Sequence, residues 1–292
     1  MGRSKLLLFP FFLGIVLMVC SWYLSYPLSI DSLEDFVFNH VSLLYWFSLP
    51  LLLASMYLIA ITCKSNFSKW IITIGLVMVM YSLSYFYYML PGSDSHYFRS
   101  LTEYFVKTTY PVPSKPHHTY FEWPSFFLLS SMMTSLSGLE LICIEFILYA
   151  TIGFLLITSL YVYAYKAHQE SGFIAVVSFF TMMFYFLNYQ FAPFSLALGI
   201  LLLLLMLEAH VTESHEKTLT MTILFASMAF THAFLPLFFV LYHLIRCILS
   251  RSKKYFRLFL LTLTIYFAVQ IFQAPLSFVD NIKSMIHASP EY

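Results

Sequence analysis

Residues 187–205 read LNYQFAPFSLALGILLLLL, a short polar and aromatic stretch followed by an unbroken apolar run. Apolar runs of about 20 residues recur from one end of the chain to the other, each long enough as a helix to cross a hydrocarbon layer of about 30 Å. The chain is 60% hydrophobic and only 10% charged, whereas soluble domains carry about 25% charged residues. The sequence therefore predicts an all-α fold, a polytopic transmembrane helical bundle with about 9–10 membrane helices.

The apolar runs define one transmembrane domain over 1–292. It has two extra helices in 1–68, a core at 69–250 with a loop at 91–123, and a last helix with a tail at 251–292. The predicted helices are 5–27, 41–63, 69–90, 124–138, 139–165, 172–188, 193–208, 216–231, 233–250 and 255–277. The helix at 124–138 reaches only about 22 Å, so we expect it to dip into the membrane and stay on one side.

Lysine and arginine indicate the orientation, because they favour the cytoplasmic side of short loops. If the N-terminus is cytoplasmic and 216–250 forms a helical hairpin, 11 of the 15 Lys and Arg residues lie inside and 4 outside. The alternative, with 124–138 crossing and 216–250 as one helix, gives 9 against 6. We therefore predict a multi-pass cell-membrane protein with a cytoplasmic N-terminus and an extracytoplasmic loop at 91–123.

Three polar interruptions fall on the predicted outer face: PGSDSHYF (91–98), NYQFAP (188–193) and THAFLP (231–236). Polar groups near hydrocarbon are costly unless they face protein or a watery cavity. Their convergence predicts a functional site. We expect Asp94, His96 and His232 to surround one lipid-accessible cavity, with Gln190 nearby.

Residues 94–108 have a helical pattern typical of an amphipathic helix lying on the outer leaflet. One stripe is apolar and aromatic: Tyr97, Leu101, Tyr104 and Phe105. The opposite stripe is polar: Ser95, Arg99 and Glu103. The sequence thus predicts a juxtamembrane helix directly after Asp94.

Asp94 has two readings that the sequence leaves open. A carboxylate at the mouth of a span can act as a general base or, together with His96, as a ligand of a divalent metal such as Mg²⁺ or Mn²⁺. Asp and Ser are also the preferred N-cap residues, so Asp94 or Ser93 can merely cap the helix. Both readings can hold together.

The other candidates also have structural alternatives. Lys115, His117 and His118 can neutralise a phosphate or belong to a solvated proline-rich loop. Glu122 is a candidate second acid beside Trp123, an interfacial anchor. Gln190 and His232 can serve the site or satisfy interhelical hydrogen bonds.

The four cysteines have no metal-ligand spacing and are expected to be buried free thiols. No basic stretch argues for nucleic acid.

The order of these elements resembles the GT-C superfamily of membrane glycosyltransferases. In that superfamily a span ends in an outer loop with an acidic residue, followed by a juxtamembrane helix and an aromatic-proline entry to the next helix. Here the matching parts are Asp94 in GSDSHYF, the helix 94–108, and YFEWPSFFLLSSMMTSLSG (120–138). LNYQFAPF, which contains Tyr189, and FTHAFLPLFF (230–239) look like two later segments of the family.

The resemblance implies a transferase that uses a polyprenyl-phosphate-linked sugar donor on the outer face, with an acceptor that the sequence does not identify. Asp94 would be the base or a metal ligand, His96 would help to position it, and Arg99, Lys115 or a loop histidine would steady the leaving phosphate. The acidic residue is single, where several branches of the family have a pair, which leaves metal dependence open. Ala233 stands where the family usually has a proline.

Two other functions compete with a glycosyltransferase. A lipid or solute transporter would line a translocation path with the polar breaks, although no inverted repeat is visible in the sequence. A non-catalytic membrane scaffold subunit would keep the helical core without its chemistry.

Overall fold

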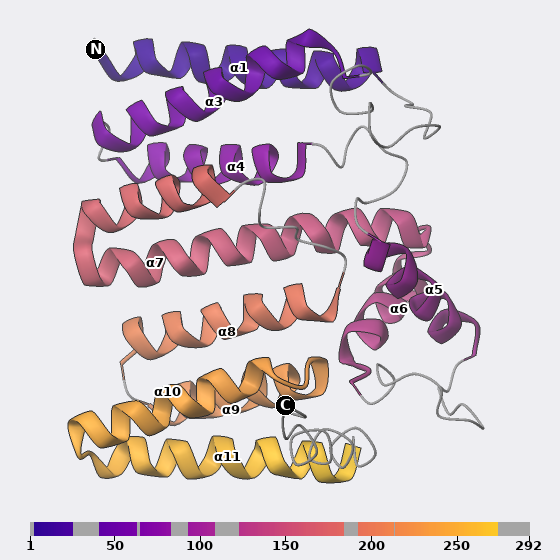
Figure 1. Cartoon of the computed structure of the whole chain (residues 1–292), viewed down its shortest axis with the longest axis vertical. Coiled ribbons are helices and arrows are strands. Elements are labelled where there is room, and N and C mark those ends of the chain that lie inside the picture. Colours follow the sequence, from indigo (N-terminus) through magenta and orange to yellow (C-terminus); the bar gives the residue numbers. More distant parts are fainter. Residues whose placement is uncertain are drawn as a thin grey trace, which may run out of the picture. The chain divides into compact units, whose positions relative to one another are not determined.

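The computed structural model describes residues 3–25, 41–62, 65–82, 93–108, 123–183, 192–212 and 214–273. Every regular element in these ranges is a helix (Figure 1). Five of the described helices are long and apolar enough to span a membrane: Leu8–Ser25, Leu43–Thr62, Leu141–Tyr165, Pro193–His210 and Lys253–Phe272. The chain is therefore a multi-pass helical membrane protein.

The five spans are fewer than the predicted nine to ten. Three further apolar stretches, Phe67–Val79, Ser125–Ser137 and Leu235–Ser250, are shorter than 18 residues. At 1.5 Å per residue, the 13 residues of the second reach only about 20 Å. This agrees with the short helix that the sequence predicts at 124–138. The predicted end of the helix 69–90 lies outside the described residues.

The chain divides into two compact units. The first comprises Met1–His96 and Glu145–Phe191. It contains α1 (Arg3–Ser25), α3 (Leu43–Thr62), α4 (Asn66–Tyr81) and most of α7 (Leu141–Met183). The second comprises Tyr97–Ile144 and Ala192–Tyr292.

In the first unit, α1, α3 and α4 approach one another closely at two glycines. A methyl group added at Gly14 of α1 would lie 2.7 Å from the Leu52 side chain of α3. One added at Gly75 of α4 would lie 2.7 Å from Phe11 and 2.8 Å from Met56. Small residues allow such approach in membranes, where helices associate through van der Waals packing.

The helix α7 covers both of the helices that the sequence predicts at 139–165 and 172–188. The backbone stays helical over 43 residues, through the polar segment 166–171. That segment, KAHQES, contains no glycine or proline and several good helix formers, so its polarity alone does not end the helix. The ribbon of α7 turns back on itself (Figure 1).

The second unit contains α5 (Ser93–Lys107) from Tyr97 onward, α6 (Ser125–Ser137), α8 (Pro193–His210), α9 (His215–Thr231), α10 (Leu235–Ser250) and α11 (Lys253–Gln273). Among the last four, consecutive helices run antiparallel to one another (Figure 1). α9 ends at Thr231 and α10 begins at Leu235. Residues 216–250 therefore form the predicted hairpin and not one helix.

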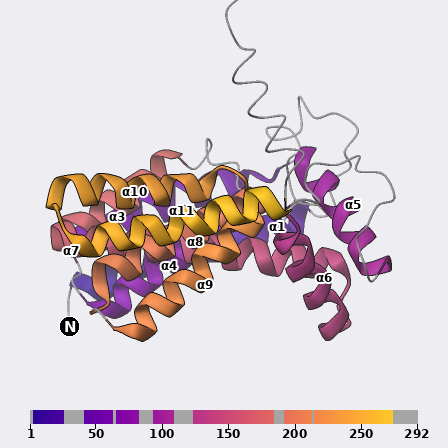
Figure 2. The ribbon, with the colours of Figure 1, turned by 90° about the horizontal axis from the view of Figure 1, so that it is seen from below.

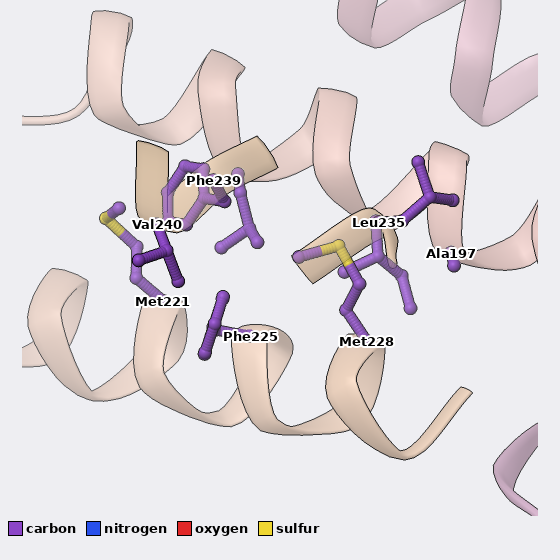
Figure 3. Packing of buried hydrophobic residues seen from close by; sticks show 9 residues of the cluster. Ala197, Met221, Phe225, Met228, Leu235, Phe239 and Val240 are labelled. Carbon is purple, nitrogen blue, oxygen red and sulfur yellow. The ribbon is translucent and has the colours of Figure 1, made fainter. Parts of the chain in front are cut away.

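The core of the second unit lies between α8, α9 and α10 (Figure 3). In α8 and α9 the contributing side chains are spaced three or four residues apart, which places them on one face. The buried members are Ala197, Ile200, Leu204, Met221, Phe225, Met228, Leu235, Phe239 and Val240. Phe225 and Phe239 pack with ring centroids 5.9 Å apart.

A buried carboxylate joins three helices at one end of this core. Glu208 of α8 lies 3.5 Å from the ammonium of Lys217 in α9 and 3.3 Å from that of Lys254 in α11. Lys217 also donates to the carbonyl oxygens of Glu208 and Val211, at 3.3 and 2.8 Å. Removing one partner of a buried ion pair leaves an uncompensated charge and costs about 3–5 kcal/mol, so this cluster fixes how α8, α9 and α11 pack.

The cysteine prediction was wrong in one respect. Cys20, Cys143 and Cys247 are free thiols, but Cys20 and Cys143 are exposed on the helix surface. A thiol is a small apolar group, and lipid tails accept such a group as readily as a protein core does. Cys63 lies outside the described residues.

The glycine contact in α1 gives a test of the packing. We expect Gly14→Val to lower the stability of the chain by about 1–3 kcal/mol, because the added carbons must displace the fully buried Leu52. Val16 belongs to the same helix and is 55% exposed, so Val16→Leu should leave stability unchanged. Thermal unfolding of both purified variants in detergent measures the difference, and equal melting temperatures would contradict the described α1–α3 contact.

Candidate functional site

The connection between α9 and α10 contains His232, a predicted site residue. Its Nδ1 accepts backbone N–H bonds from Phe234 at 3.1 Å and from Leu235 at 3.4 Å. The first N–H groups of a helix have no partner inside the helix, and Pro236 contributes none. The imidazole thus accepts from the N-cap residue Phe234 and from the first helical residue Leu235, and it closes the turn before α10 as an Asn or Asp side chain does in an Asx turn.

These two bonds determine the protonation state of His232. A ring nitrogen that accepts hydrogen bonds carries no proton, so in the neutral ring the proton is on Nε2. Burial lowers the pKa of His232 below its usual 6.5, which keeps the ring neutral at pH 7. His232 therefore offers Nε2–H as a hydrogen-bond donor, and its Nδ1 is not available as a general base or metal ligand.

Two other segments meet the α9–α10 connection. The ring of Phe194, at the start of α8, lies edge-on to the ring of His232 with centroids 5.6 Å apart. Trp123, just before α6, packs against Ala233, and both are buried. Pro193 is the first residue of α8 and Pro124 directly precedes α6. Proline is favoured at a helix start, so the local sequence places these aromatic side chains at helix ends.

Two neutral N–H donors lie at this end of the second unit. The indole nitrogen of Trp123 is buried and has no hydrogen-bond partner within the described part of the chain. Together with Nε2–H of His232 it provides two uncharged donors at one end of the second unit. Such donors in a site with little water stabilise negative charge on an oxygen without a desolvated cation. The arrangement suits an oxygen-rich or anionic ligand group.

The helix α5 lies beside α6 (Figure 2). Phe127 of α6 stacks on Phe105 at 5.5 Å and meets Phe98 at 6.0 Å, between ring centroids. Glu103 and Lys107 form an exposed ion pair at 3.7 Å on the solvent side. The amphipathic pattern is therefore present, although its buried face also includes Phe98 and Thr102, which the predicted stripe leaves out.

The predicted residues fall into three groups. His232 and the half-buried Arg99 are described with their side chains. Asp94 and His96 lie in the first turn of α5, and their side chains are outside the described residues. Six others lie outside the described residues altogether: Lys115, His117, His118, Glu122, Tyr189 and Gln190.

The structure refines two of the sequence interpretations. α5 begins at Ser93, so Ser93 and Asp94 are both helical residues of its first turn, where a carboxylate is favoured by the helix dipole. His232 is bonded through Nδ1 to the backbone of its own turn. The sequence signal for this role is a polar side chain four residues before a proline that is the second residue of a helix.

The described residues contain no group of three or more His, Cys, Asp or Glu side chains placed to hold a metal.

The chain was compared with family models, with curated proteins and with solved structures, and none of them matches it.

Two substitutions test the backbone hydrogen bonds that His232 accepts. His232→Ala removes the acceptor and should lower the free energy of unfolding by about 0.5–1.5 kcal/mol, the usual net value of a hydrogen bond. His232→Asn keeps an acceptor for the N–H groups of Phe234 and Leu235 and should stay near wild-type stability. Thermal unfolding in detergent measures both. If the two variants melt at the same lowered temperature, the hydrogen bonds from Phe234 and Leu235 to residue 232 do not account for the loss of stability.

Proposed function

We propose that this chain is a membrane glycosyltransferase of the GT-C type, which transfers a sugar from a polyprenyl-phosphate-linked donor to an acceptor on the extracytoplasmic face. The observation that carries the proposal is the polarity of the second unit. Its two ends differ in charge and in the hydrogen-bonding groups they offer, so a site for an anionic group can lie at one end of the unit.

One end of the second unit is cationic. All six Lys and Arg residues between 192 and 273 lie within about two helical turns of the connections 211–214 and 251–252. They are Lys217, Arg246, Arg251, Lys253, Lys254 and Arg257. The opposite end, with the described residues 192–194 and 232–234, has none. Since Lys and Arg favour the cytoplasm, this asymmetry supports an extracytoplasmic location for His232, Phe194 and Trp123.

The chemistry of the outer end agrees with a phosphate leaving group. A polyprenyl phosphate carries its negative charge at membrane depth, where neutral N–H donors such as those of His232 and Trp123 stabilise it. Phe194 is 49% exposed and provides an apolar surface of the kind that an isoprenoid chain contacts. In the same proposal Arg99, Lys115 and the loop histidines His117 and His118 supply cationic partners for the phosphate.

The reaction uses Asp94 as general base and His96 as the residue that positions it. The carboxylate takes the proton of an acceptor hydroxyl, whose oxygen bonds to the anomeric carbon of the sugar. The bond between that carbon and the phosphate oxygen breaks, and the polyprenyl phosphate leaves with the electron pair. General-base catalysis of this kind contributes about 10²–10⁴-fold to the rate.

Asp94→Asn tests the enzyme directly. We expect donor turnover to fall at least about 100-fold, with unchanged thermal stability, because the amide keeps the shape of the carboxylate. The assay follows release of polyprenyl phosphate from polyprenyl-phosphate monosaccharides by the full chain in nanodiscs. Glu103→Gln is the matched control, since Glu103 is an exposed carboxylate on the same helix. Wild-type turnover in Asp94→Asn would overturn the role of Asp94 as general base, whereas no turnover in the wild type would favour a scaffold or transporter.

Sidedness has its own test. In a variant without native cysteines, we expect Asp94→Cys to react with a membrane-impermeant maleimide in intact cells. Ser252→Cys, in the α10–α11 connection, should react only after the cells are opened, because the positive residues around it favour the cytoplasm. The reverse labelling pattern would end the proposal, since the lipid-linked donor would then be on the wrong side of Asp94.

A further inference from the structure

A cavity of about 190 Å³ lies between α4 and α7 within the first unit. It is separate from the outer site, and nothing in the proposed function uses it. Its lining combines one cation, two hydroxyl-bearing threonines and aromatic or apolar side chains: Lys69, Trp70, Thr73, Thr158, Tyr161 and Val162. The cavity therefore offers polar and apolar contacts together.

The polar part of the lining can bind an anion. Lys69 is only 5% exposed, and its ammonium lies 4.7 Å from the centre of the Tyr165 ring. An ammonium has three N–H donors, so a ligand oxygen can share it with other partners. The hydroxyl oxygen of Thr158 is buried and has no hydrogen-bond partner in the described ranges. A buried unsatisfied hydroxyl costs about 1–3 kcal/mol, which a ligand oxygen would recover.

The position of the cavity along the helices indicates headgroup depth. Lys69 and Trp70 lie in the first turns of α4, which Ser65 caps. Tyr161 and Val162 lie in the last turn of the candidate span Leu141–Tyr165. Trp, Tyr and Lys are the side chains that gather at membrane–water interfaces. The ammonium is thus at the level where lipid phosphates lie.

The apolar surroundings favour a lipid over a soluble anion. Trp70 stacks on Phe154 with ring centroids 5.8 Å apart, and both rings are exposed on the surface, at 52% and 37%. The cavity is smaller than the roughly 300–1,000 Å³ of sites that enclose a whole small molecule. It has room for a phosphate and a few carbons, while the rest of the ligand would extend over the exposed ring pair.

We propose that the α4–α7 cavity binds the phosphate headgroup of an anionic membrane lipid, with the Lys69 ammonium and the Thr158 hydroxyl as its polar partners. Under the orientation proposed above, this end of the unit faces the cytoplasm, the leaflet that carries the anionic phospholipids. The site would tie α4 to α7 through a lipid and is independent of the outer chemistry.

The test is native mass spectrometry of the full chain in detergent. The probes are phosphatidic acid and phosphatidylcholine with the same acyl chains. We expect phosphatidic acid to bind more tightly, and Lys69→Gln to weaken it about tenfold or more, as loss of a charge-assisted hydrogen bond does. Thr158→Val should weaken it a few-fold. Lys253→Gln removes an exposed cation at the start of α11 and should have no effect.

Two further variants keep the result interpretable if Lys69→Gln does not fold. Val162→Phe fills the cavity and leaves Lys69 in place, so it should lose binding, whereas Lys69→Arg should retain it. Equal binding of the two lipids would overturn the proposal, as would binding that survives both Lys69→Gln and Val162→Phe. Competition by glycerol 3-phosphate at the concentration of the lipid would assign the cavity to a soluble phosphate and overturn the lipid assignment.

Discussion

Hydrocarbon contains no water, so each polar group of a membrane helix must find its partner inside the protein. Several buried hydroxyls of the described residues meet that demand within their own helices. Ser55 donates to the carbonyl of Leu51, Thr102 to that of Phe98 and Ser130 to that of Phe126. Some groups that need more than a backbone carbonyl lie near helix ends. Glu208 and Lys217 lie near one end of the second unit, and His232 lies at the other.

The parts of the fold that follow from local sequence were predictable. Apolar run length indicates helices, and Pro193 and Pro236 mark where α8 and α10 begin. The short α6 follows from the length of its apolar run. The helical backbone of the polar segment 166–171 was not predicted, because the sequence was divided at these residues although they favour helix, and α7 nevertheless turns back on itself (Figure 1). The surface position of Cys20 and Cys143 was also missed, since apolarity in a membrane protein does not separate the core from the lipid side.

The candidate site was predictable to a smaller extent. Periodicity indicates which face of α5 packs inward, and a polar break beside a proline indicates where a helix end carries His232. Contacts between distant segments, such as Phe194 with His232 and Trp123 with Ala233, depend on tertiary packing that no local pattern contains. The tautomer of His232 likewise follows only from its two backbone bonds.

Lys217 acts at two stages in the life of the chain. While the polypeptide is being inserted, its ammonium belongs to the positive residues that hold a connection in the cytoplasm, and Glu208 barely opposes that signal because acidic residues contribute little to orientation. Once α8 and α9 pack, the same ammonium is enclosed by a carboxylate and two carbonyls. A residue that first directs topology thereby becomes a buried link between two helices. Part of the charge pattern that oriented the chain is then no longer on the surface of the folded protein.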